Sequence, residues 1–169
     1  MSKVDWDTVY DQQAPRLYNF LRYRTGNSET AKDLTAQVML KAWRHRASYQ
    51  DEIGTFTTWL FQIARNAAVD HYRKQKHSPL PLYDAHQHAS DFSLETEVQK
   101  LLDADRLYCL FQKLPERDQE IIALKYGADM TNRDIAEVLN LTESNVGTIL
   151  HRTIKTLRSQ WEMTYARTE

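Results

Sequence analysis

The chain has 169 residues, of which 41% are hydrophobic and 27% charged, so it can form one ordinary domain or two small ones. Its single cysteine, Cys109, excludes an internal disulfide framework and fits a reducing compartment. No apolar stretch is long enough to span a bilayer, and the N-terminus lacks a signal-peptide core, so we expect a cytoplasmic protein. With four glycines, four prolines and no long alternating pattern, the sequence predicts an all-α fold.

The net charge of −1 is unevenly distributed. Residues 1–78 hold twelve Lys or Arg against eight Asp or Glu, whereas 79–97 hold four acids and no Lys or Arg. The last part, 98–169, is nearly balanced. This distribution predicts two small helical domains, 1–78 and 94–169, joined by a flexible linker over 79–93 that contains two prolines.

Three helices are predicted in the first domain. The first runs from about 5 to 25 and is stopped by Gly26, and the second runs from a cap at Ser28 to about Ser48. The apolar stripe of the first helix consists of Tyr10, Ala14, Leu17, Tyr18 and Leu21.

The third helix, over 56–77, combines an aromatic, apolar face with a basic end. Its apolar residues recur at helical spacing; they are Phe56, Trp59, Leu60, Ile63, Ala64 and Ala67. Aromatic rings can stack on unstacked nucleic-acid bases, and cations beside them can contact phosphates. A run of basic residues, however, more often forms only the solvent-exposed face of a helix. Because Phe56 and Trp59 are expected in the core, Tyr49 in the preceding polar loop is the better candidate for stacking.

The second domain is predicted to end in a helix-turn-helix. A helix over 94–114, with Cys109 in its apolar stripe as an inert core residue, precedes a short helix over 116–127. Thr131 and Asp134 then have capping-box spacing, and a tight turn at 140–142 leads into a longer helix.

The longer helix is expected to bury Val146, Leu150 and Leu157. Its outer face presents Ser144, Asn145, Thr148, Arg152 and Lys155. The three short polar side chains could reach base edges in the major groove, and the two cations suit phosphates. A helical hairpin with a solvated outer face is the alternative.

Catalysis finds little support. The sequence has no glycine-rich phosphate loop, no cysteine pair at metal-ligand spacing and no nucleophile motif, so we expect no enzyme, cofactor or metal. His86 and His88 lie two residues apart, with His71 and His77 nearby, but solvated linker histidines are the better interpretation.

Three blocks together resemble the extracytoplasmic function (ECF) sigma factors of bacterial RNA polymerase. The polymerase-binding segment of the family is resembled by residues 31–49, AKDLTAQVMLKAWRHRASY. The segment that reads the minus-ten element is resembled by residues 56–74, FTTWLFQIARNAAVDHYRK. LPERDQEIIALKYGADMTNRDIAEVLNLTESNVGTILHRTIKTLR (114–158) resembles the module that reads the minus-thirty-five element. The blocks follow the order of the family and cover nearly the whole chain.

The resemblance implies partners and site residues. The partners are the RNA polymerase core (through its β′ clamp helices and β flap), promoter DNA and an anti-sigma factor, with no membrane insertion. Residues implied in docking on the clamp helices are Asp33, Gln37, Lys41 and Trp43. Residues implied in capturing the minus-ten strand are Tyr49, Thr55, Asn66, Asp70 and Arg73. Of these, Asn66 is the expected base reader because its amide both donates and accepts.

One departure from the family pattern concerns Gly147 and Ile149, where family members often carry Lys and Arg. We expect two phosphate contacts to be lost there, and Gly147 to weaken the helix by about 1 kcal/mol. Two rival functions are a helical adaptor whose basic face meets an acidic protein, and a helix-turn-helix repressor that binds duplex DNA without polymerase.

Overall fold

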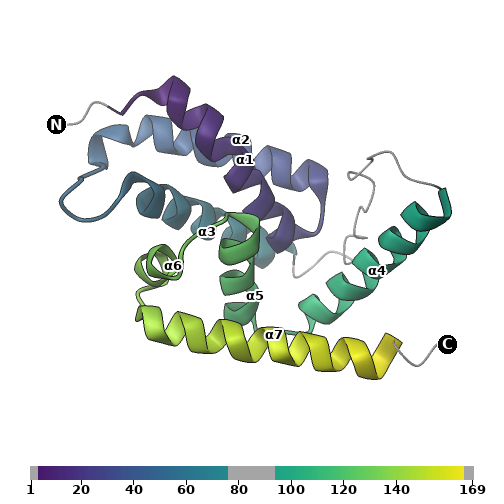
Figure 1. Ribbon diagram of the computed structural model, residues 1–169. Coiled ribbons are helices and arrows are strands. Elements are labelled where there is room, and N and C mark those ends of the chain that lie inside the picture. Colours follow the sequence, from purple (N-terminus) through teal and green to yellow (C-terminus); the bar gives the residue numbers. More distant parts are fainter. Residues whose placement is uncertain (1–3, 76–93, 166–169) are drawn as a thin grey trace.

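A computed structural model describes residues 4–75 and 94–165, and every regular element in these ranges is helical (Figure 1). The first half contains α1 (Trp6–Thr25), α2 (Ser28–Arg44), the 3₁₀ turn η1 (Arg46–Ser48) and α3 (Phe56–Gln75). The second half contains α4 (Leu94–Gln112), α5 (Glu116–Ile122), the π-helical turn η2 (Ala123–Gly127), α6 (Asn132–Leu139) and α7 (Glu143–Tyr165). The predicted all-α class is confirmed, and the predicted linker over 79–93 lies outside the described residues.

Local signals fix both ends of α1 as predicted. The carboxylate of Asp5 accepts a hydrogen bond from the Asp7 N–H at 3.3 Å. Gly26 then ends the helix in the left-handed region, at φ 66°, and its N–H donates to the Arg22 carbonyl at 2.9 Å. This conformation favours glycine because it has no Cβ.

The predicted bounds of α2 are wrong at both ends. The cap is Asn27, whose side chain accepts from the Thr30 N–H at 2.9 Å, while Ser28 is buried. The α-helix ends at Arg44, and the chain tightens into η1 before Tyr49 instead of continuing to Ser48.

The helix-turn-helix forms as predicted. Thr131 and Asp134 make a reciprocal capping box at the start of α6, with backbone-to-side-chain bonds of 3.1 and 3.3 Å. Asn140 takes the left-handed conformation at φ 54°, and the Thr142 hydroxyl accepts from the Asn145 N–H at 3.1 Å. These contacts hold the short turn that sets α6 against α7.

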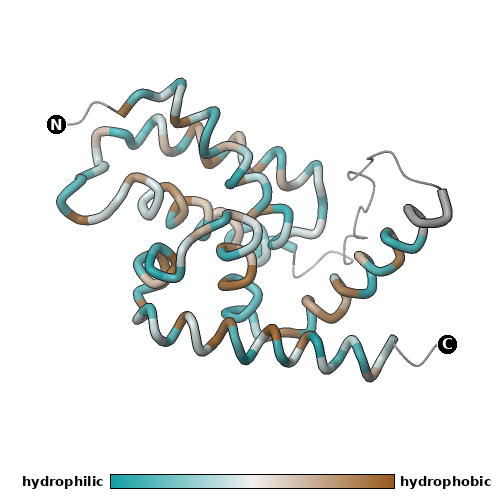
Figure 2. Tube along the Cα trace, in the orientation of Figure 1, coloured by the Kyte–Doolittle hydropathy of each residue, from teal (hydrophilic) through white to brown (hydrophobic). Residues whose placement is uncertain are grey.

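The two halves pack against each other over one continuous apolar core. In Figure 1, α1 and α3 of the first half lie beside α5 and α6 of the second, and α7 closes the lower side. The core joins fully buried residues of both halves, among them Leu17, Phe20, Leu60, Phe61, Leu124 and Ile135. Along α7, hydrophobic and hydrophilic residues alternate at helical spacing (Figure 2), as expected for a helix with one buried face.

Gly127 permits a close approach between the halves. A Cβ built on it would lie 3.0 Å from Cδ2 of Tyr23 and 3.1 Å from the Asn19 carbonyl oxygen. The sequence assigned Gly127 only to the end of a helix, whereas the fold places it directly against α1.

Two core predictions are wrong. Tyr10 is 58% exposed because the second half packs along α1 from Arg16 onward, and Tyr10 precedes that stretch. Cys109 is exposed because α4 turns Leu110 and Phe111 inward instead.

Candidate polymerase and nucleic-acid interface

The outer face of α2 is open to a partner. Asp33, Gln37 and Lys41 are exposed, as their predicted docking role requires, while Leu34 and Val38 are buried as expected. Two apolar side chains on this helix are also exposed: Leu40 at 49% and Trp43 at 44%. The surface therefore combines charge with apolar area, a composition suited to a protein interface.

Arg46 fixes the outer side of Trp43. Its guanidinium carbon lies 4.1 Å from the centre of the indole ring, and Nη1 donates to the Trp43 carbonyl at 2.7 Å. A cation stacked on the indole ring restricts the orientations that the ring can take. Trp43 therefore lies in a fixed position at the edge of the α2 face.

Five aromatic rings form a cluster where the first half begins and α2 gives way to α3. We call Trp6, Trp43, Tyr49, Phe56 and Trp59 the aromatic cluster. Neighbouring ring centroids lie 5.1 to 5.6 Å apart, with Trp6 edge-on to both Trp43 and Phe56. The sequence identified Tyr49 as a stacking candidate but missed the contribution of Trp6, because no periodicity relates segments so far apart.

Tyr49 lies at the edge of this cluster, and its phenol is neutral near pH 7 like that of any tyrosine. Burial, and secondarily the charge of Asp51, raise the pKa of Tyr49 above its ordinary value. A neutral ring beside two others can accept a stacked base without a repulsive charge toward phosphate.

The polar face of α3 begins about two turns after Trp59 of this cluster. Asn66, Asp70 and Arg73 are exposed at i, i+4 and i+7 spacing, which places all three on one side of the helix. Thr55 is also exposed, but its hydroxyl accepts from the Thr58 N–H at 3.2 Å, so it caps α3.

The start of α7 is equally accessible. All five predicted DNA-contacting residues of this helix are exposed. The Thr148 hydroxyl donates to the Ser144 carbonyl at 3.0 Å, while Arg152 lies 3.5 Å from a carboxylate oxygen of Asp118 on α5.

Ile149 does not lie on the outer face of α7. It is only 5% exposed and belongs to the core. Gly147 is half-buried, and a Cβ added to it would lie 3.7 Å from the Asn132 amide nitrogen, an ordinary contact. Glycine at position 147 therefore lowers the helix propensity of α7, although no neighbouring atom requires a residue without a Cβ there.

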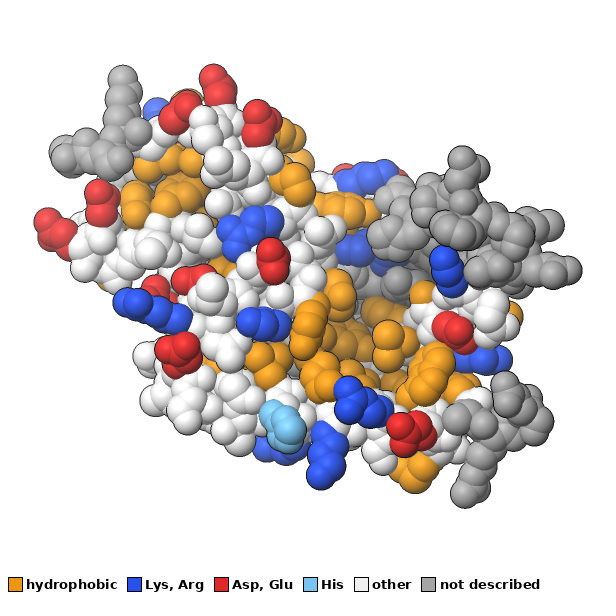
Figure 3. All heavy atoms as spheres, viewed as in Figure 1, with side chains coloured by type: hydrophobic (Ala, Val, Ile, Leu, Met, Phe, Trp, Pro, Cys, Tyr) orange, Lys and Arg blue, Asp and Glu red, His pale blue; other side chains and the backbone are white. Residues whose placement is uncertain are grey.

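An apolar groove of about 650 Å³ opens between α1, α4 and α7. Figure 3 shows hydrophobic side chains gathered in this hollow. Its apolar lining includes Tyr23, Leu107, Phe111, Tyr126, Leu157 and Trp161. The sequence did not reveal the groove, because it forms only when the two halves come together.

Within the described residues, no group of three or more His, Cys, Asp or Glu side chains could hold a metal ion. Burial lowers the pKa of His71 below its ordinary value. His77, His86 and His88 lie outside the described residues. Over the same described ranges, no helix combines the length and apolarity needed to cross a membrane.

Two family models match the chain. Sigma-70 region 2 matches residues 9–78, and Sigma-70, region 4 matches residues 104–157. A curated relative, the ECF RNA polymerase sigma factor BldN of Streptomyces coelicolor, is 28% identical over 153 residues, spanning 88% of this chain and 57% of that protein. The ECF RNA polymerase sigma factor SigM of Bacillus subtilis is 25% identical over 153 residues, spanning 90% of this chain and 93% of SigM.

Two solved structures share the fold at 19% identity. The sigma factor RpoE of Bartonella quintana, in complex with the anti-sigma factor NepR, has a TM-score of 0.71 and matches over 95% of this chain and 98% of that chain. CnrH, in complex with the cytosolic domain of CnrY, has a TM-score of 0.69 over 94% of this chain and 88% of that chain.

Proposed function

This chain belongs to the sigma-70 family as an ECF sigma factor, and we propose that it binds RNA polymerase core and directs it to promoters by reading the minus-ten and minus-thirty-five elements. The observation that carries the proposal is the exposure of three separate surfaces, on α2, α3 and α7, each formed by the block that resembles the corresponding family segment. A helical adaptor would need only one such surface.

Docking on the core is assigned to α2. Asp33, Gln37 and Lys41 offer charge and hydrogen bonds to the β′ clamp helices, and Trp43 offers a fixed apolar edge. The second half would meet the β flap, as the family resemblance implies. A repressor that acts without polymerase leaves the open face of α2 unexplained.

Promoter melting is assigned to α3 and the aromatic cluster. Asn66 would read an extruded base of the minus-ten strand, Arg73 would contact phosphate, and Tyr49 would support the base by stacking. Duplex DNA at the minus-thirty-five element would meet the start of α7, where Asn145 and Thr148 reach base edges and Lys155 reaches phosphate.

The proposed partners include an anti-sigma factor. The apolar groove between α1, α4 and α7 is exposed in the free protein and touches both halves, so one amphipathic segment seated there would contact the two halves together. Until a signal removes it, such a partner would keep the halves from separating.

The test is a binding and transcription assay with purified core polymerase. The double variant Asp33→Arg with Gln37→Ala should lose core affinity and run-off transcription while keeping its helical circular dichroism. Tyr49→Ala and Asn66→Ala should bind core normally but give weaker permanganate reactivity at the minus-ten region. Asp11→Asn, at an exposed acid of α1 outside these faces, is the matched control. If the wild-type protein does not bind core, the proposed function is wrong.

A further inference from the structure

Trp6 stands at the start of α1, ahead of the residues that the family model covers. The match to Sigma-70 region 2 begins at residue 9. Trp6 is the first residue of the helix, and the N–H of Val9 donates to the carbonyl of the capping residue Asp5 at 2.9 Å. This first turn of hydrogen bonds fixes the backbone that carries the indole ring.

The indole ring of Trp6 contacts a ring from each of the two following helices. The start of α1, the end of α2 and the loop that leads into α3 lie at the same end of the first half (Figure 1). The Trp6 centroid lies 5.1 Å from that of Trp43, near the end of α2, with 87° between the ring planes. It lies 5.6 Å from that of Phe56, the first residue of α3, with 86° between the planes. Both are edge-to-face contacts at a separation where aromatic pairs attract, so one side chain joins three helices.

The loop between α2 and α3, residues 50–55, is anchored at both ends by rings of the same aromatic cluster. Tyr49 precedes the loop and Phe56 follows it, and their centroids lie 5.4 Å apart, edge to face. Tyr49 also lies 5.6 Å from Trp59, which is nearly one turn further along α3. Ile53, inside the loop, is 81% exposed, so the loop buries little apolar area of its own. The position of the loop therefore depends on where these rings lie.

The fully buried aromatic residues of the first half lie elsewhere. Phe20 and Phe61 have no exposed area and pack edge to face, with centroids 5.8 Å apart. Trp6 is only partly buried, and Trp43, which it contacts, is 44% exposed. A ring at the rim adds less to stability than a fully buried ring, because stabilisation follows the apolar area removed from water. The contacts of Trp6 lead instead to the docking face of α2 and to the loop before α3.

We propose that Trp6 is a positioning residue for both proposed sites of the first half, and the inference rests on the proposed function for what those sites bind. By holding Phe56 against Tyr49, Trp6 limits the arrangements that the loop 50–55 takes before a base arrives. Such preorganisation lowers the entropy cost of binding. By packing against Trp43, it keeps that ring at the edge of the α2 face. Docking on polymerase and capture of an extruded base therefore both depend on one side chain.

Hydrogen exchange, measured by NMR in the free full-length protein, tests the positioning of the loop. The N–H groups of Ile53 and Trp59 report on the loop and on the start of α3, since each donates to a backbone carbonyl at 3.1 Å. In Trp6→Ala both should exchange about tenfold faster than in the wild-type protein, a factor equivalent to about 1.4 kcal/mol.

Two matched variants separate the ring contacts from general stability. Trp6→Phe keeps a ring that can make both edge contacts, so exchange at Ile53 and Trp59 should return to within about twofold of the wild-type rate. Phe20→Leu changes a fully buried ring of the same helix that lies outside the aromatic cluster. It should lower the free energy of unfolding but leave the exchange of these two N–H groups within about twofold of the wild-type rate.

Assays with purified core polymerase test the consequence for function. They are run at a temperature where circular dichroism shows every variant to be folded, so that a loss of stability alone changes neither readout. Trp6→Ala should bind core about fivefold more weakly and form open complexes about tenfold more slowly at a promoter that the wild-type holoenzyme uses. Trp6→Phe should recover both properties, and Phe20→Leu should retain both.

The inference is overturned if Trp6→Ala exchanges like the wild-type protein or opens promoters at the wild-type rate. Equal acceleration of exchange in Phe20→Leu, or no recovery in Trp6→Phe, also overturns it. If Trp6→Ala loses its helical circular dichroism, Trp6→Leu decides, because it keeps apolar volume without a ring and must show the same faster exchange. A wild-type protein that does not bind core overturns the proposed function instead, and the exchange rates still decide whether Trp6 holds the loop.

Discussion

The substitution Gly26→Ala measures how tightly the halves pack. Gly26 ends α1 at φ 66°, and a Cβ built there would lie 2.0 Å from the hydroxyl oxygen and 2.5 Å from Cζ of Tyr108 on α4. Alanine at this position therefore meets two separate penalties. One is the backbone strain of a left-handed residue, and the other is a clash that exists only while α4 is packed against α1.

The two penalties have different sizes. Left-handed strain for alanine is about 1 kcal/mol and belongs to the first half alone. Relief of the clash requires the Tyr108 ring to move by more than an ångström, although Phe111 lies beside it with ring centroids 6.1 Å apart. Overpacking of this kind costs about 1–3 kcal/mol, so we expect Gly26→Ala to lower the free energy of unfolding by about 2–4 kcal/mol.

A double-mutant cycle with Tyr108→Ala separates the penalties. Urea unfolding should show that Gly26→Ala costs about 1 kcal/mol in the Tyr108→Ala background, because only the backbone strain remains. An equal cost in both backgrounds would refute contact between Gly26 and Tyr108 in solution. A cost near zero in both would also refute the left-handed conformation.

Three further predictions concern α7 and α3. Asn145→Ala should change which minus-thirty-five sequences are preferred, by about 1–3 kcal/mol per lost bidentate contact. Arg152→Ala should instead weaken binding to all of these sequences similarly and reduce the slope of log affinity against log salt by about one. Holoenzyme binding to a library of minus-thirty-five variants at several salt concentrations tests both, and the reverse pattern would mean that α7 is rotated. Gly147→Ala should raise the free energy of unfolding by up to about 1 kcal/mol, and Ile149→Lys should lower it by at least about 2 kcal/mol. Urea unfolding measures both, and free energies of unfolding that change alike in the two variants would contradict the burial of Ile149. Because the pKa of His71 is lowered in the folded protein, its contribution to stability is complete above about pH 6.5 and declines as the pH falls below that value. Urea unfolding between pH 5.5 and 7.5 should therefore show that the free energy of unfolding depends less steeply on pH in His71→Gln than in the wild-type protein. An unchanged pH dependence would contradict the lowered pKa.

Sequence reasoning succeeded where a feature depends on neighbours along the chain. The stop at Gly26 and the capping box of Thr131 and Asp134 are local signals, and the structure contains both. It failed where burial depends on which helices pack against each other. Cys109 fits an apolar helix stripe but lies on the open side of α4, and Ile149 fits a DNA-facing position but packs into the core. No local pattern distinguishes these alternatives, because the deciding neighbours lie on other helices.

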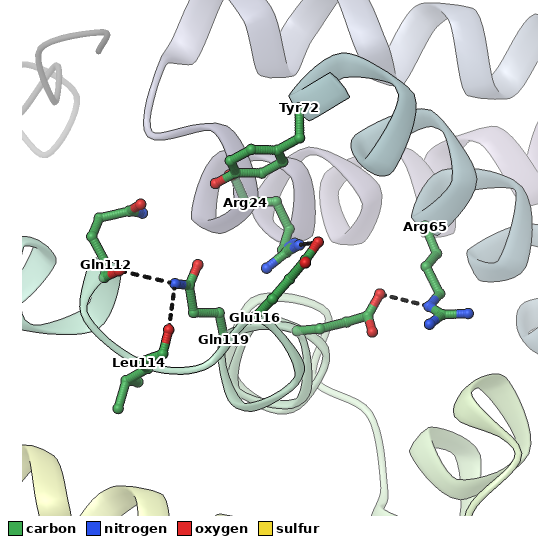
Figure 4. Close-up of polar contacts among 8 residues, drawn as sticks. Arg24, Arg65, Tyr72, Gln112, Leu114, Glu116 and Gln119 are labelled. Carbon is green, nitrogen blue, oxygen red and sulfur yellow. Dashed lines mark hydrogen bonds and ion pairs between the residues drawn. The ribbon is translucent and has the colours of Figure 1, made fainter. Parts of the chain in front are cut away.

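Arg24 also bears on how firmly the two halves pack against each other, because it faces Glu116 of α5 across them (Figure 4). Burial of an ion with incomplete pairing costs on the order of several kcal/mol, so the packed halves are less stable than their apolar core alone would make them. A partner seated in the groove between α1, α4 and α7 would contact both halves. If it binds only while the halves are packed, then at a hundred times its Kd it stabilises that packing by about 2.7 kcal/mol.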